Sequence, residues 1–138
     1  PELYVTQVFI RVPPHIDAAR ARGQARESLF KQRRAAGLPP FALDPKLDEI
    51  ATRYAADLAA GVERIGAGAV ANRALADVAI SYAAVLTVIS VVGDPADVAA
   101  TAIGDARMMA YGLGVAQGHD NELGGGALYV VLLLGRAR

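Results

Sequence analysis

Cysteine is absent from the 138-residue chain, which excludes a disulfide, a thiolate nucleophile and a Cys-ligated zinc site. Net charge is absent as well, because 14 Lys and Arg residues balance 14 Asp and Glu residues. A chain without a strong field has little to attract nucleic acid or an anionic membrane, so we expect no nucleic-acid partner. Histidine is limited to His15 and His119, both near predicted turns, which argues against a serine hydrolase.

Long hydrophobic runs are missing too, and the composition is that of one globular domain. The longest uncharged run covers residues 78–93, which is too short for a membrane span and is interpreted as a buried strand. Hydrophobic residues make up 54 % and charged residues 20 % of the chain, enough for a single packed core. The chain begins at Pro1 without an initiator Met, which predicts a fragment or a processed form.

The N-terminal segment has the pattern of a strand. Residues 3–12 are apolar on both faces, and Pro13 and Pro14 follow them; proline ends a strand because it cannot donate to the sheet ladder. An isolated strand of this kind exposes unpaired backbone groups. We therefore hypothesise that it adds to the edge of this domain's sheet; the alternatives are that it belongs to a preceding domain or pairs with a second copy of the chain.

A helix is predicted next, and it sets the expected domain boundary. Residues 16–36 are rich in Ala, Arg and Gln and lack Pro, which favours a helix, and Gly37 is placed to end it. Gly23 either divides this stretch or precedes the main helix. We therefore divide the chain into an N-terminal strand and connector, residues 1–23, and a main domain, residues 24–138.

The second helix has the clearest start, stripe and end. Asp44 is a good N-cap, and Pro45 suits the first helical position. An apolar stripe at helical spacing follows and predicts a face packed on the core; its members are Leu47, Ile50, Ala51, Tyr54, Ala55 and Leu58. Gly61 is expected to close the helix.

The rest of the chain predicts an α/β (α+β) fold. The run over residues 78–92 is apolar on both faces, so as a strand it must be covered on both sides. The other expected elements are a loop or short helix over 62–75, a helix over 94–109, a strand over 112–116, a Gly-rich turn over 117–126 and a strand over 127–134. Strands separated by helices, with a terminal hairpin, indicate a three-layer α/β/α sandwich around a small, mostly antiparallel sheet.

Residues 29–58 resemble the opening of CAP domains, the superfamily of cysteine-rich secretory, antigen-5 and pathogenesis-related proteins and their bacterial relatives. The matching features are an Arg near the end of the first helix, a Gly-Leu-x-Pro-like turn, an Asp-Pro-x-Leu helix start and Ala at four-residue spacing; here they are Arg33, Gly37, Leu38, Pro39, Pro40, Phe41, Asp44, Pro45, Leu47, Ala51 and Ala55. Looser matches are Arg73, residues 94–107, residues 112–116 and residues 129–133. The resemblance covers about residues 24–136 and implies a secreted, periplasmic or cell-envelope location.

The chain departs from this family at the positions of its site. The resemblance implies a cleft in which two His and two acidic residues hold a divalent metal, yet residues 61–93 contain no His and residues 85–89 contain no Glu. Ala106 stands at the second His position, before Arg107, and Phe30 stands at a usual Asn. Leu, Thr and Ala cannot replace imidazole and carboxylate ligands. The resemblance therefore implies a degenerate site without catalytic residues, metal or cofactor.

Several polar or Gly-rich segments have a structural interpretation beside a functional one. The cluster of residues 119–122 is either a solvated hairpin turn or a weak cation site. The glycines of residues 112–114 and 124–126 flank strands and do not open a helix, which argues against a phosphate loop. A run of basic residues on the first helix is interpreted as a solvated face; it comprises Arg20, Arg22, Arg26, Lys31, Arg33 and Arg34.

Two functional hypotheses follow. The first is a non-catalytic CAP-like module that binds a lipid, peptide or protein ligand or spaces the domains of a larger extracytoplasmic protein. The second is a hydrolase or metal-dependent enzyme with an unrecognised site, which three or more convergent polar groups with perturbed pKa values would favour. Five polar residues are most suited to line the cleft that the CAP resemblance implies: Arg73, Asp77, Tyr82, Asp105 and Arg107.

Overall fold

The computed structural model describes residues 17–95, 105–120 and 124–136, so the strand predicted over residues 3–12 lies outside the described part. The described elements are α2 (Ala18–Ala35), β1 (Ala42–Leu43), α3 (Pro45–Ala59), α4 (Arg64–Val78), a short 3-10 helix (Ala79–Ser81), β2 (Ala84–Val92), β3 (Met108–Asp120) and β4 (Gly124–Arg136).

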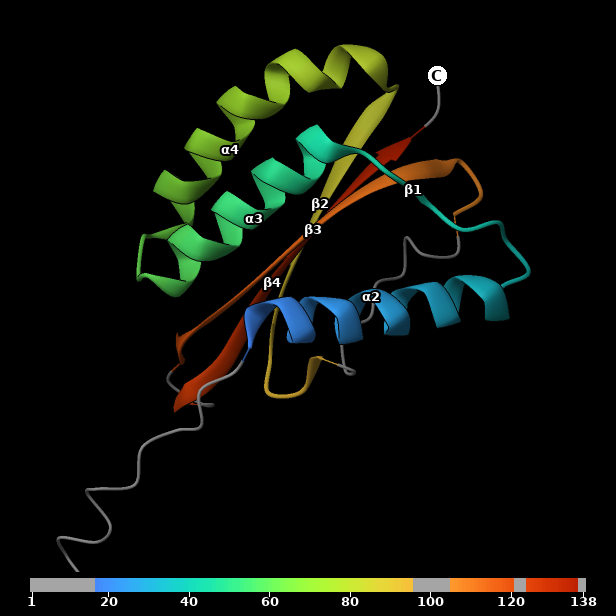
Figure 1. Ribbon diagram of the computed structural model, residues 1–138. Coiled ribbons are helices and arrows are strands. Elements are labelled where there is room, and N and C mark those ends of the chain that lie inside the picture. Colours follow the sequence, from blue (N-terminus) through green and yellow to red (C-terminus); the bar gives the residue numbers. More distant parts are fainter. Residues whose placement is uncertain (1–16, 96–104, 121–123, 137–138) are drawn as a thin grey trace, which may run out of the picture.

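These elements form the predicted three-layer α/β/α sandwich (Figure 1). The strand order is β1-β3-β4-β2. The two-residue β1 runs parallel to β3, while β2 and β3 each run antiparallel to β4, so the sheet is mixed and mostly antiparallel, as expected. Helix α2 covers one face, and α3 and α4 cover the other.

Strand β4 joins the two cores. Its side chains alternate between the sheet faces: Leu132 and Leu134 pack with α2, whereas Val131 and Leu133 pack with α3 and α4. All four are almost completely buried. A strand apolar on both faces is thus explained by a central place between two helical layers.

The predicted helix ends are confirmed. Asp44 caps α3 by accepting a hydrogen bond from the Lys46 N–H, and Pro45 is the first helical residue. Gly37 and Gly61 follow α2 and α3 with φ of 74° and 92°, the left-handed conformation in which glycine is favoured.

Gly23 does not divide the first helix, because α2 runs without interruption from Ala18 to Ala35. Its N-cap is Asp17, whose carboxylate accepts hydrogen bonds from the N–H groups of Ala19 and Arg20. The helix thus begins before residue 24, where the main domain was expected to start; the division itself stays a prediction.

The predicted core stripe of α3 is confirmed. Leu47, Ala51, Tyr54, Ala55 and Leu58 are buried, and Ile50 is partly buried. The helix backbone lies directly on β3, where glycines face it: a Cβ on Gly112 would be 2.2 Å from the Leu47 carbonyl carbon. Small residues on both partners therefore let α3 approach the sheet.

Leu58→Ala is expected to lower the free energy of unfolding by about 2–5 kcal/mol, the usual cost of truncating a buried Leu. The Leu58 side chain is 5 % exposed, whereas Leu43 is 50 % exposed, so Leu43→Ala is the matched control with a smaller loss. Urea unfolding followed by circular dichroism measures both. A loss below about 0.5 kcal/mol for Leu58→Ala, the range of surface substitutions, would show that the stripe does not carry the core.

Other element boundaries differ from expectation. Helix α4 covers residues 64–78 and so most of the range 62–75, for which a loop or a short helix was expected; its Ala67 and Ala71 are buried beside α3. Strand β2 begins at Ala84 and not at residue 78, because α4 continues to Val78. Both faces of β2 contact a core as predicted, but none of its residues is fully buried, since β2 lies at the edge of the described sheet.

The last two strands are longer than predicted. The helix expected to reach residue 109 does not, because Met108 already begins β3; residues 96–104 lie outside the described part. Strands β3 and β4 pair from Met108 to Asp120 and from Gly124 to Arg136. Residues 117–120 and 124–126 of the predicted turn belong to the strands, because backbone pairing continues through Gly118 and Gly124.

Candidate functional site

One end of the sheet gathers most of the predicted site residues. Ala84 of β2 and Met108 of β3 both pair with Arg136, the last residue of β4. Tyr82 therefore precedes β2 at the same end where Asp105 precedes β3. We call this the Arg136 end of the sheet; it is the candidate site.

Arg33 is the most buried polar residue described, at 1 % exposure. Its Nε donates to the Pro39 carbonyl, its Nη1 to the Asp105 carbonyl and its Nη2 to the Met108 carbonyl, each over 2.8 Å. The guanidinium carbon lies 4.2 Å from the centre of the Phe41 ring, a favourable cation–π geometry. Arg33 thus ties α2 to the segments before β1 and β3, and the prediction of a solvated side chain is wrong.

The buried guanidinium remains the charged form of the side chain. Burial lowers the pKa of Arg33, and the nearby carboxylate of Asp105 opposes that effect. Arginine stays protonated even after a substantial lowering. Its role is accordingly to hold three backbone carbonyls, since a fixed cation neither donates nor accepts a proton in a reaction.

Phe30, at the position where the resemblance expects Asn, belongs to an aromatic cluster. Its ring meets Tyr111 edge-on at 5.3 Å between centroids and lies 6.3 Å from Phe41. All three rings are part of, or packed against, the α2 core. This part of the Arg136 end is filled with apolar side chains.

Asp105 and Arg107 pair with each other. Arg107 Nη2 lies 3.0 Å from Asp105 Oδ2, and the Arg107 backbone N–H donates to Asp105 Oδ1. The hydrogen bonds from the Arg107 side chain and backbone lower the pKa of Asp105, and the same contact raises the pKa of Arg107. The pair closes a local turn at the surface, where such ion pairs contribute little to stability.

Tyr82 pairs with Asp44 on the other face of the sheet. The Tyr82 hydroxyl donates a hydrogen bond to Asp44 Oδ2, and the Tyr82 ring packs over Gly135, where an added Cβ would lie 2.7 Å from it. Partial burial would raise the pKa of Asp44, but hydrogen bonds from Tyr82 and from the N–H groups of Lys46 and Leu47 outweigh it and lower that pKa. Partial burial and the bond to Asp44 raise the pKa of Tyr82 to about 12.

The raised pKa of Tyr82 predicts a loss of stability at high pH. The unfolded chain releases the phenolic proton near pH 10, whereas the folded chain holds it to about pH 12, so this contribution is complete below pH 10 and disappears as the pH rises toward 12. We expect the difference between the tyrosinate absorbance titrations of the folded wild type and Tyr82→Phe to have its midpoint near 12. A midpoint near 10 would mean that Tyr82 is neither buried nor bound to Asp44.

Arg73 and Asp77 are exposed on the last turns of α4. The five predicted site residues thus form one pair in the turn before β3, one Tyr82–Asp44 pair on the α3/α4 side, and two exposed side chains on α4. Whether they line a binding groove stays a prediction. Of the residues 119–122, His119 and Asp120 end β3, and residues 121 and 122 lie outside the described part.

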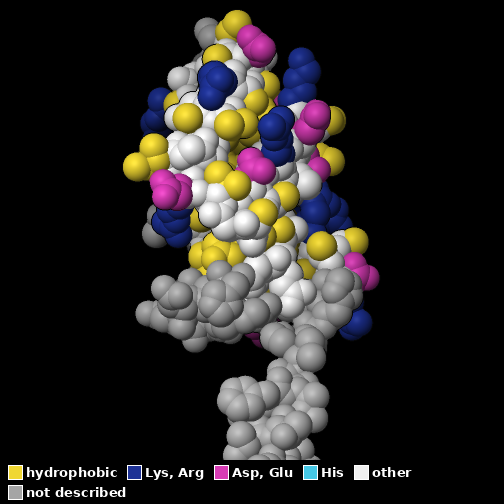
Figure 2. Space-filling model, turned by 90° about the vertical axis from the view of Figure 1, so that its left-hand side faces the viewer, with side chains coloured by type: hydrophobic (Ala, Val, Ile, Leu, Met, Phe, Trp, Pro, Cys, Tyr) yellow, Lys and Arg dark blue, Asp and Glu magenta, His cyan; other side chains and the backbone are white. Residues whose placement is uncertain are grey.

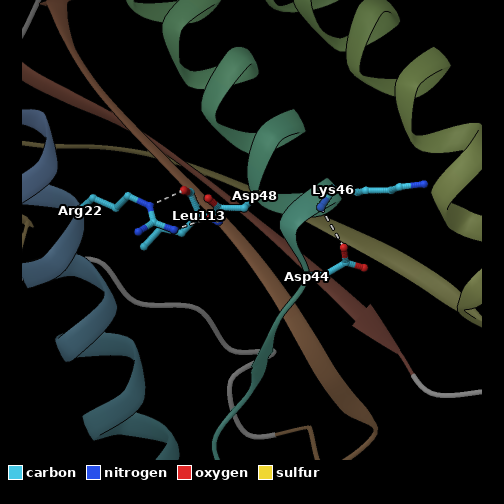
Figure 3. Close-up of polar contacts among 5 residues, drawn as sticks. All are labelled: Arg22, Asp44, Lys46, Asp48 and Leu113. Carbon is cyan, nitrogen blue, oxygen red and sulfur yellow. Dashed lines mark hydrogen bonds and ion pairs between the residues drawn. The ribbon is translucent and has the colours of Figure 1, made fainter.

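A further polar contact, between Arg22, Asp48 and Leu113, was not predicted from the sequence. Arg22 Nη2 binds Asp48 Oδ1 at 2.5 Å and Arg22 Nε donates to the Leu113 carbonyl, while Asp48 accepts from the Leu113 N–H at 3.0 Å (Figure 3). The contact joins α2, α3 and β3. Arg22 was predicted to be solvated with the other basic residues of its helix; only the long-range packing distinguishes it.

A small pocket lies between α3 and α4. Its volume is about 110 Å³. Three charged residues line it, Glu49, Arg53 and Asp57, and the rest of the lining is mainly apolar: Ile50, Tyr54, Ala67, Val70, Ala71 and Ala74. The face shown in Figure 2 carries basic, acidic and hydrophobic side chains intermixed, without a field of one sign.

The comparisons with known proteins support the fold. No family model matches the chain, and no curated protein matches it. A crystal structure of a cysteine-rich secretory protein from Staphylococcus aureus subsp. aureus Mu50 aligns with a TM-score of 0.62 and 15 % identity, covering 89 % of this chain and 40 % of that one. The chain therefore has the CAP fold that residues 29–58 predicted, and it spans less than half of that protein. Within the described residues, no helix is long and apolar enough to cross a membrane.

Proposed function

We propose that the domain is a non-catalytic CAP-like module of an extracytoplasmic protein, which binds a ligand or spaces neighbouring domains. The observation that carries the proposal is how the polar groups at the Arg136 end are engaged. Arg33 donates hydrogen bonds to three backbone carbonyls. Asp105 accepts hydrogen bonds from Arg107, and Asp44 accepts one from Tyr82. Catalysis needs groups that converge on one reacting atom, and these groups are instead bound to one another or to backbone carbonyls.

The pKa shifts support the same proposal. A general base or nucleophile has its pKa moved toward neutrality. Here the pKa values of Asp44 and Asp105 are lowered and that of Tyr82 is raised, so each group is held more firmly in its resting protonation state. Among the described residues, no three His, Asp or Glu side chains gather as metal ligands do.

A ligand would meet mixed polar and apolar surface in this proposal. Arg73, Asp77, Tyr82, Asp105 and Arg107 are the candidate contacts at or near the Arg136 end, and a lipid, peptide or protein is the candidate ligand. The proposed secreted, periplasmic or cell-envelope location rests on the CAP fold and on the similarity to a staphylococcal protein described as secretory.

Purified domain is expected to contain no structural divalent metal. Elemental analysis should find no stoichiometric metal, and the melting temperature should be the same with EDTA and with zinc, because a tightly bound ion would stabilise the folded state by mass action. His119→Ala is the control: a zinc-dependent rise that this variant abolishes would establish a metal site in the terminal hairpin and refute the proposal.

Hydrolysis of an activated ester provides the direct test of the non-catalytic role. Wild type, Tyr82→Phe and Asp105→Ala are expected to release p-nitrophenol from p-nitrophenyl acetate at the same low rate. Turnover by the wild type that either variant abolishes, without a loss of melting temperature, would identify an enzyme.

A further inference from the structure

The free edge of the sheet has the composition of an interior strand. Within the described residues, β2 ends the strand order and pairs only with β4. Its nine residues, AVLTVISVV, include no charge, Pro or Gly, and its register with β4 is continuous. Edge strands are usually protected by charges, prolines or bulges, because their unpaired N–H and C=O groups attract another strand.

The side chains of β2 are incompletely covered on both faces. Val88 packs against the α2 core and Ile89 against the α3/α4 core, yet both are only partly buried. Residues 130–134 of the adjacent β4 are at most 2 % exposed. A further strand beside β2 would bury apolar surface on both faces of the sheet.

The opposite edge is partly covered. Beyond the two-residue β1, the N–H and C=O groups of Leu113 in β3 are bound by Asp48 and Arg22 (Figure 3). These side chains take the place of a neighbouring strand. Among the described strands, β2 in contrast presents an edge of nine residues with no strand beyond it.

The start of α2 lies beside the end of β2. Asp17, the N-cap of α2, lines the same surface pocket as Gly93 and Pro95, which follow β2; Figure 1 shows the two elements meeting there. Residues 13–17 can span at most about 17 Å, and paired strands lie about 4.8 Å apart. The end of the segment 3–12 is thus within reach of the last residues of β2.

We propose that residues 3–12 add to the free edge of β2 as a fifth strand, parallel to it. Both segments have their C-terminal ends near the start of α2. An antiparallel strand would require the connector to cross the length of β2, about 30 Å, which it is too short to do. The apolar residues on both faces of the segment match the two incompletely covered faces of β2.

Spin labels test both the pairing and its direction. The chain has no Cys, so Arg11→Cys and Glu2→Cys each provide a single attachment site for a nitroxide. In the parallel arrangement, the label at residue 11 broadens the amide resonances of residues 90–92 and leaves those of 84–86 sharp, while the label at residue 2 does the reverse. The opposite pattern, or no broadening in β2, would overturn the proposal.

A mixed sample separates pairing within one chain from exchange between copies. Spin-labelled chains without ¹⁵N are mixed with unlabelled ¹⁵N chains under refolding conditions, and no broadening is expected. Broadening in the mixture would show that the segment pairs with a second copy, against the proposal.

Deletion of residues 1–13 gives an independent readout. Amide exchange in β2 is expected to become at least about tenfold faster than in the full chain, because the edge groups lose their partners, while Val131 of β4 keeps its protection. Unchanged exchange in β2 would contradict the proposal. Should the truncated chain not fold, the spin-label experiment on the full chain still decides it.

Discussion

Arg33→Met is expected to lower the free energy of unfolding by at least about 4.5 kcal/mol, since three hydrogen bonds from a charged donor are lost and each typically contributes about 1.5–3 kcal/mol in such a setting. The carbonyls of Pro39 and Met108 would be left near an apolar side chain, and unsatisfied buried acceptors are costly. A loss of this size is a large fraction of the stability of a small domain. Urea unfolding followed by circular dichroism measures it.

Two further variants separate the geometry of Arg33 from its charge. Arg34→Met removes an exposed charge from the adjacent position and should change stability little. Arg33→Lys keeps the charge but cannot direct three planar donors to three carbonyls, so it should recover only part of the loss. Equal effects of Arg33→Met and Arg34→Met would contradict the role assigned to Arg33.

The parts of the fold that depend on neighbouring residues could be predicted from the sequence. Asp44 and Pro45 start α3 by local capping and Gly61 ends it with positive φ, so a few adjacent residues determine the helix. The stripe from Leu47 to Leu58 depends only on helical spacing. Those same local features carried the resemblance to CAP domains, whose fold the structure confirms.

The contacts that position the candidate site could not be predicted in this way. Arg22 and Arg33 belong to one run of basic residues, and nothing in the spacing distinguishes a guanidinium on three carbonyls from a solvated one. The Tyr82–Asp44 bond joins residues 38 positions apart. Such partners are fixed by how the helices and strands pack together. Local sequence patterns do not show which residues far apart in the chain will meet.

The edge position of β2 could not be predicted from the sequence either. Its apolar composition indicates that both faces of the strand are covered. Composition does not tell whether the strand also has a neighbour on each edge. The hairpin lengths were underestimated because Gly118 and Gly124 were interpreted as turn residues, while in the structure their backbones continue the ladder.

Gly114→Ala is expected to lower the free energy of unfolding by about 3 kcal/mol or more, at the upper end of the cost of overpacking a core. A Cβ at this position would lie 2.1 Å from the Ala51 carbonyl oxygen and 2.6 Å from the Thr52 nitrogen. These atoms are helix backbone, so no rotamer change relieves the contact; α3 would have to move away from the sheet. Gly23→Ala is the matched control, because its added Cβ meets nothing within 4 Å in α2 and should stabilise the helix by about 0.5–1 kcal/mol.

The double variant Gly114→Ala with Ala51→Gly identifies the origin of that loss. Were the clash with the Ala51 side chain, its removal would restore stability. Because the contacts within 3 Å are with the backbone of Ala51 and Thr52, the second change should give no rescue and should add the further cost of glycine inside a helix, about 0.5–1 kcal/mol. Recovery of wild-type stability in the double variant would mean that α3 approaches β3 through side chains and that the glycines of β3 are not what allows the close contact.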